Sequence, residues 1–149
     1  MTSDEAFREL DNLIRLHPDK ADIGAPVSDE AIRKAQDFLE ISFPGAYIRF
    51  LRTWGTLAVG PIEFYNIVGT EFENSGIPNG VWFTYVKRKQ VGLPKDLIVL
   101  LTNDGDEYHC LEIPSGRIVK WDVLQKKIIG QKSEDIFNFV LKESREWFI

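Results

Sequence analysis

Five consecutive aliphatic residues, LIVLL at residues 97–101, constrain the fold of this chain more than any other segment. A run of this length without alternation is typical of a short strand covered on both faces, and it is far too short to cross a bilayer. The segment Asn103-Asp-Gly-Asp follows, and its Asp-Gly pair tolerates the positive φ of a tight hairpin turn. We therefore predict a buried strand that pairs with the alternating residues 107–113.

Further β-rich segments extend this hairpin. Pro114-Ser-Gly provides a second turn, residues 117–121 (RIVKW) a third strand and residues 123–129 a candidate fourth strand. Residues 61–68, PIEFYNIV, are β-branched and aromatic between two glycines and also predict a strand. Residues 69–80 are rich in Gly, Asn and Pro and are expected to be a loop.

Helices are predicted on both sides of this β-rich block. Residues 4–16, 29–40 and 134–147 each have apolar residues at helical spacing, and each follows a Ser that can cap the first turn. The last of these is expected to bury Trp147. A third helix should begin at Pro44 and end at Gly55, while residues 18–27 should form a loop.

Residues 81–90 fit two structures. Val81, Trp82, Tyr85 and Val86 form a helical stripe, and the basic residues 87–89 suit a helix C-terminus, whereas the β-rich composition favours a strand. In sum, residues 1–149 are expected to form one α+β domain. It should contain an antiparallel, meander-type sheet of about four to six strands, with helices from both chain ends packed around it.

The chain has a single cysteine, so no internal disulfide is possible. Its acidic, amphipathic start lacks the basic region and apolar stretch of a secretion signal. From these two features we expect a cytoplasmic protein.

The negative charge is concentrated near the start of the chain. The formal net charge is −5 at pH 7, and residues 1–40, with ten acidic and five basic residues, carry all of it. Residues 53–86 contain no Lys or Arg but include Glu63, Glu71 and Glu73. Phosphate contacts need clustered cations, so we expect no direct nucleic-acid binding and favour a basic protein partner. The plainer alternative is that the acidity only keeps the protein soluble.

Residues 103–110, NDGDEYHC, gather three carboxylates, a histidine and the only cysteine, which raises the question of a metal or catalytic centre. Neighbouring strand residues point to opposite faces, so His109 and Cys110 are not expected to act together. The chain holds only three imidazole and thiol groups, too few for a typical zinc site. The positions of Gly105 and Pro114 do not fit a helical calcium loop. We predict no cofactor or metal, and instead a solvated turn; the alternative is that this turn also contacts a partner.

Three segments resemble signatures of the SUKH superfamily. Residues 28–55, SDEAIRKAQDFLEISFPGAYIRFLRTWG, resemble its opening helices, and residues 60–67, GPIEFYNI, its first sheet strand. Residues 91–122, VGLPKDLIVLLTNDGDEYHCLEIPSGRIVKWD, resemble its strand–turn–strand block, which ends in Trp-Asp. Thr56 departs from the pattern, because many members have a second glycine there.

The resemblance implies a function in protein binding. Many bacterial SUKH proteins are immunity proteins that neutralise a cognate polymorphic toxin, often a nuclease, and related domains act as an interaction scaffold in a fungal regulator of cell-wall assembly. The family is not known for catalysis, so we expect no enzyme activity. We also expect no membrane partner, because the longest aliphatic run, residues 97–101, is too short to cross a bilayer. The alternatives that stay open are a general scaffold and a carboxylate-dependent hydrolase. The residues expected to contact the toxin are Glu63, Tyr65, Glu71, Glu73, Asp104, Asp106 and Glu107.

Overall fold

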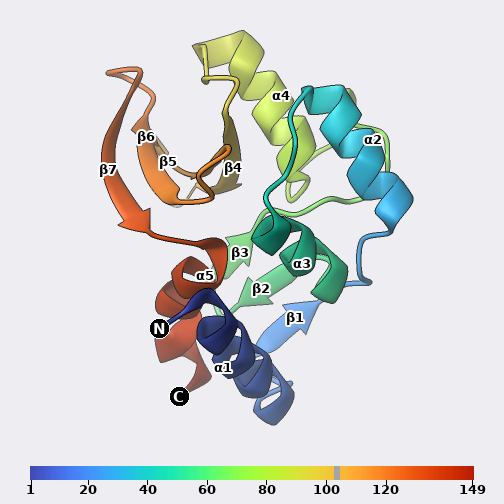
Figure 1. Ribbon diagram of the computed structural model, residues 1–149, viewed down its shortest axis with the longest axis vertical. Helices are drawn as coiled ribbons and strands as arrows, with labels where there is room; N and C mark the ends of the chain where they lie inside the picture. The colour runs from blue at the N-terminus through green and yellow to red at the C-terminus, as the bar shows by residue number, and fades with distance from the viewer. Residues whose placement is uncertain (103–104) are drawn as a thin grey trace.

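The meander predicted from the sequence forms a four-stranded antiparallel sheet in the computed structural model, which describes residues 1–102 and 105–149 (Figure 1). Its strands follow sequence order: β4 (Leu97–Leu101), β5 (Glu107–Glu112), β6 (Ile118–Asp122) and β7 (Lys127–Ser133). The fourth strand begins at Lys127 rather than at residue 123. The intervening residues form a turn in which Asp122 Oδ2 accepts from the Gln125 amide at 2.7 Å, and Lys126 has a positive φ.

All five residues of β4 are buried, as its composition predicted. Ile98 and Leu100 pack into a large core, whereas Leu97 and Val99 pack into a smaller core on the opposite face. The sheet therefore separates two apolar clusters. The smaller one lies between the sheet and α4 (Gly80–Val91).

β4 is an edge strand of its sheet, yet its outer edge is covered. The Val99 amide donates to Thr84 Oγ1 of α4 at 3.0 Å, and the Leu100 carbonyl accepts from the Tyr65 amide at 2.8 Å. Both are buried backbone groups, which are costly to leave unpaired. These two bonds fix α4 and the segment around Tyr65 against the sheet.

A second antiparallel sheet was not predicted. It consists of β1 (Ala21–Ile23), β2 (Leu57–Val59) and β3 (Ile62–Phe64), in the order β1-β2-β3. The α+β class is confirmed, but residues 18–27 are not only loop, and the strand expected over residues 61–68 is shorter. Each of these strands has only three residues, too few to show the alternation by which strands are recognised in sequence.

The helices enclose the large core. α1 (Ser3–Leu16), α2 (Asp29–Leu39), α3 (Gly45–Thr53) and α5 (Ile136–Ser144) all contribute buried residues to it. α1 lies beside α5, so the two chain termini lie at the same end of the molecule (Figure 1). Among the described residues, no helix combines the length and apolar character that crossing a membrane requires.

The N-caps of α1 and α5 differ from the predicted serines. Thr2, rather than Ser3, accepts from the Glu5 amide and forms a capping box with Glu5. Asp135, rather than Ser133, caps α5 by accepting from the Asn138 amide. The predicted cap Ser28 is confirmed for α2.

Helices α3 and α5 end earlier than predicted. α3 ends at Thr53 with Trp54 as its C-cap, so Gly55 is not the cap. α5 ends at Ser144 and continues as a 3₁₀ turn, η1 (Arg145–Phe148). The tighter turn moves Phe148 into the core and leaves Trp147 41% exposed, so the prediction that Trp147 is buried was wrong.

The helical alternative for residues 81–90 is confirmed by α4. Asn79 Oδ1 accepts from the amides of Val81 and Trp82 at the start of the helix, and Gly92 adopts a left-handed conformation at its end. The β-rich composition of this segment is explained by burial of Val81 and Phe83 against the sheet.

Gly55 is required by close packing rather than by helix capping. A Cβ at this position would lie 1.9 Å from the carbonyl oxygen of Ala25, whereas a Cβ at Gly45 would meet nothing within 4 Å. We predict that Gly55→Ala lowers the free energy of unfolding by about 3 kcal/mol, because the backbone must shift. Gly45→Ala, the matched control at the start of α3, should leave stability unchanged or raise it by less than about 1 kcal/mol. Urea unfolding measures both, and equal effects would contradict this packing.

A candidate protein-binding face

A groove of about 270 Å³ opens where β3 approaches the end of β4. Its lining is mainly apolar, with two hydroxyl groups and one carboxylate; the lining residues are Pro61, Ile62, Glu63, Tyr65, Ile77, Leu101 and Thr102. Ile77 is 56% exposed, so its side chain adds apolar surface that a partner can reach beside the groove. No Lys or Arg is among these described lining residues.

Tyr65 and Thr102 form the polar wall of the groove. The Tyr65 hydroxyl and Thr102 Oγ1 share a short hydrogen bond. Burial raises the pKa of Tyr65, the bond with Thr102 partly opposes this rise, and the nearby Glu63 carboxylate adds to it. The phenol is therefore neutral at pH 7 and keeps its hydrogen-bonding capacity toward the groove.

An aromatic row links the groove to Asp106. The ring of Phe83 lies 5.2 Å from that of Tyr65 and 5.5 Å from that of Tyr108. Burial raises the pKa of the Tyr108 phenol, and Cys110, Tyr65 and Asp106 raise it further. Glu63 and Asp106 thus each bring negative charge to one of two tyrosines at opposite ends of the row.

The small sheet presents an acidic surface that adjoins the groove and shares Glu63 with it. Asp22 pairs with Ala58, and Ala58 pairs with Glu63, so the three side chains lie in one row across the sheet. The inner face of the same sheet buries Leu57, Val59 and Phe64. Side chains alternate between faces, so this row points outward, and Asp22 and Glu63 are exposed.

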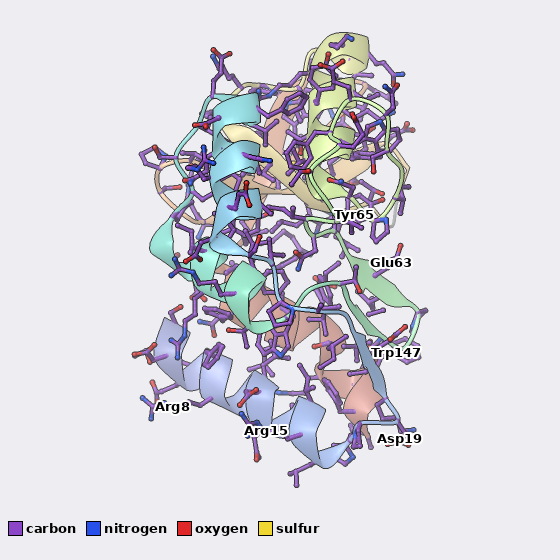
Figure 2. The ribbon with its side chains drawn as sticks, turned by 90° about the vertical axis from the view of Figure 1, so that its right-hand side faces the viewer. Arg8, Arg15, Asp19, Glu63, Tyr65 and Trp147 are labelled. Carbon is purple, nitrogen blue, oxygen red and sulfur yellow. The ribbon has the colours of Figure 1, made fainter. Side chains whose placement is uncertain are left out.

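Trp147 borders this surface. Its indole packs on Gly60 in the turn between β2 and β3. The contact is so close that a Cβ added to Gly60 would lie 3.0 Å from the ring. Figure 2 shows Tyr65, Glu63, Trp147 and Asp19 following one another along one side of the molecule, whereas Arg8 and Arg15 lie away from it on α1. We call the groove, the outward row and Trp147 the binding face.

The loop that supplies Ile77 is fixed at its base by two asparagines. The backbone N–H of Asn66 donates to the Pro78 carbonyl at 2.9 Å, and the side-chain Nδ2 of Asn79 donates to the Val68 carbonyl at 2.9 Å. Both asparagines are fully buried. Their burial could not be predicted from the sequence, because an isolated Asn in a loop gives no signal of burial.

The structure brings only part of the predicted contact set together. Glu63 and Tyr65 line the groove, and Asp106 is exposed next to Tyr108, whereas Asp104 lies outside the described residues. Glu107 lies on the other face of β5 and forms an ion pair with Lys120 at 3.2 Å.

The other two predicted contacts belong to the loop. The Glu71 carboxylate accepts from the amides of Glu73 and Asn74, so it stabilises its own loop. Glu73 is exposed but does not line the groove. Trp147 was not among the predicted contacts, because the sequence placed it in a continuous helix.

His109 and Cys110 face opposite sides of the sheet, as predicted. The His109 ring packs 5.6 Å from the ring of Phe139 in α5, while Cys110 belongs to the smaller core and burial raises the pKa of its thiol. Within residues 1–102 and 105–149, no three His, Cys, Asp or Glu side chains form a group suited to a metal ion.

Residues 8–147 match the family model SUKH_5, described as SMI1-KNR4 cell-wall. The chain belongs to the SUKH family. The match extends beyond the segments that resembled the family, from α1 through the C-terminal 3₁₀ turn. No curated protein matches the sequence of this SUKH-family protein.

The electrostatic link between Glu63 and Tyr65 can be measured directly. We predict that Glu63→Gln lowers the pKa of Tyr65, because removal of the carboxylate charge makes ionisation of the phenol less unfavourable. Glu73→Gln, which removes an acid outside the groove, should leave this pKa unchanged. An NMR titration of the Tyr65 ring carbon at alkaline pH gives both values, and an unchanged pKa in Glu63→Gln would place the carboxylate away from the phenol.

Proposed function

We propose that this SUKH-family protein is an immunity protein that binds and neutralises a toxin with a basic, nucleic-acid-cleaving domain. The observation that carries the proposal is the location of Glu63, an exposed acid that belongs both to the lining of the groove and to the outward row of the small sheet. The segment around it, residues 53–86, has no Lys or Arg. A surface of this kind complements the cations with which a nuclease holds phosphate.

Inhibition would follow from occupation of that cationic surface. Carboxylates at Glu63, Asp22 and Asp106 would steer the toxin and replace its nucleic-acid phosphates, while Trp147 supplies apolar contact area at the border of the face. Partly exposed aromatic side chains beside charged ones are typical anchors of protein interfaces. The proposal includes a cytoplasmic location, where the toxin would act.

We also propose that the protein acts without catalysis. Cys110 is fully buried and the pKa of its thiol is raised, so its nucleophilic thiolate form is disfavoured. Its neighbour His109 lies on the other face of the sheet. These features argue against a hydrolase with a Cys–His nucleophile, which would need the thiolate and the imidazole side by side and open to substrate.

The words of the matched family description favour a second candidate. A family described as SMI1-KNR4 cell-wall is consistent with an interaction scaffold, in which the same face would bind a regulatory partner. The two functions differ in whether the protein protects a cell from a toxin.

Co-expression with a basic toxin domain encoded beside the gene tests the proposal. We expect the protein to restore growth and to form a complex with the toxin on gel filtration. If growth is not restored and no complex forms, the immunity proposal is wrong. If the protein instead captures a housekeeping partner from cells that contain no toxin, the scaffold function is supported.

Substitutions on the binding face should weaken this complex selectively. Glu63→Lys and Trp147→Ala are each expected to raise the Kd about tenfold or more, because they remove charge complementarity and an aromatic anchor. Asp37→Lys changes the net charge as much as Glu63→Lys does but lies on α2, so it should change the Kd far less. Calorimetry measures the three values. Equal weakening by Glu63→Lys and Asp37→Lys would mean that net charge, and not this face, determines binding.

A further inference from the structure

We propose that the groove receives one long cationic side chain, an arginine or a lysine, from the partner protein. The proposal rests on the proposed function only in taking the partner to be a protein with a basic surface. It assigns a specific contact within the binding face, with the apolar stem of the side chain inside the groove and its charged end at Glu63.

The size of the groove favours a single side chain. Sites for small molecules usually enclose about 300–1,000 Å³ and bury most of the ligand, whereas this groove has about 270 Å³ and is open. Its walls at Pro61, Ile62 and Ile77 are apolar. Arg and Lys place their methylene stems along such walls while the charged group stays in contact with water or a carboxylate.

The polar groups of the groove favour a cation. Glu63 supplies a carboxylate, and the neutral hydroxyls of Tyr65 and Thr102 supply further acceptor lone pairs. An anionic ligand would be repelled by Glu63, and a purely apolar side chain would leave the carboxylate without a partner. Arginine should bind better than lysine, because its planar fork can form two parallel bonds to one carboxylate.

Glu63 is available for this contact. Two acids of the four-stranded sheet already have cations of their own: Glu112 contacts Arg117 at 2.6 Å, and Glu107 contacts Lys120 at 3.2 Å. Within the described part of the chain, Glu63 forms no such ion pair. A partner's cation would therefore not have to displace an internal one.

The experiment uses the full chain and small probes. N-acetyl-L-argininamide, its lysine counterpart and the neutral isostere N-acetyl-L-citrullinamide are titrated into the ¹⁵N-labelled protein and followed by NMR. We expect the argininamide to shift the amides of Glu63, Ile77 and Thr102 with a Kd of about 1–10 mM, as suits one side chain. The lysine probe should bind more weakly, and the citrulline probe about tenfold more weakly or worse.

Two variants give the matched comparison. Glu63→Gln should weaken argininamide binding to the level of the citrulline probe, while Glu73→Gln, an exposed acid outside the groove, should leave it unchanged. Equal binding of the arginine and citrulline probes, or shifts spread over acidic residues elsewhere, would overturn the assignment.

The outcome is separate from the test of toxin neutralisation. Growth rescue without argininamide binding would overturn the groove assignment and leave the immunity function standing. Argininamide binding at the groove without rescue or complex formation would support the groove assignment and overturn the immunity function.

Discussion

The buried edge of β4 is the constraint on which the rest of the molecule depends. A strand of five aliphatic residues must be covered on both faces, and as an edge strand it must also satisfy its outward backbone groups without water. The Thr84 hydroxyl accepts from the Val99 amide, and the Tyr65 amide donates to the Leu100 carbonyl. The same two contacts hold α4 on one side of the sheet and bring β3 to the end of β4, where the groove forms.

The position of the groove follows from this arrangement. The Tyr65 amide is committed to β4, while its ring packs against Phe83 and its hydroxyl reaches Thr102 just after the strand. The loop that carries Ile77 is held by Asn66 and Asn79, and Asn79 also caps α4. A partner would thus meet a preformed surface, which lowers the entropic cost of association.

The sequence allowed prediction of those features that depend on local patterns. The aliphatic run of β4, the cap at Ser28 and the opposite orientations of His109 and Cys110 follow from residue type and period alone. The small sheet could not be predicted in this way, because a strand of three residues is too short to show the alternation of apolar and polar residues. Pairing of Ala58 with Asp22 and Glu63 is a property of the tertiary structure, and it is what aligns the acids of the binding face.

The candidate site was predictable only in part for the same reason. Glu63 and Tyr65 were identified from an acidic, cation-free segment, but alternation along β5 turns Glu107 to the other face, where Lys120 pairs with it. Trp147 could not be identified, since its exposure depends on the change from α-helix to 3₁₀ helix after Ser144. Charge patterns thus show which segment carries the acids, and packing determines which of those acids line the groove.

Hydrogen–deuterium exchange of the protein with and without the basic toxin domain tests the central claim most directly. The account predicts that complex formation slows exchange in peptides that span residues 57–66 and 76–80 and in the C-terminal peptide that contains Trp147. Slowed exchange confined to α2 or to the exposed strand β7, with those three peptides unchanged, would contradict it.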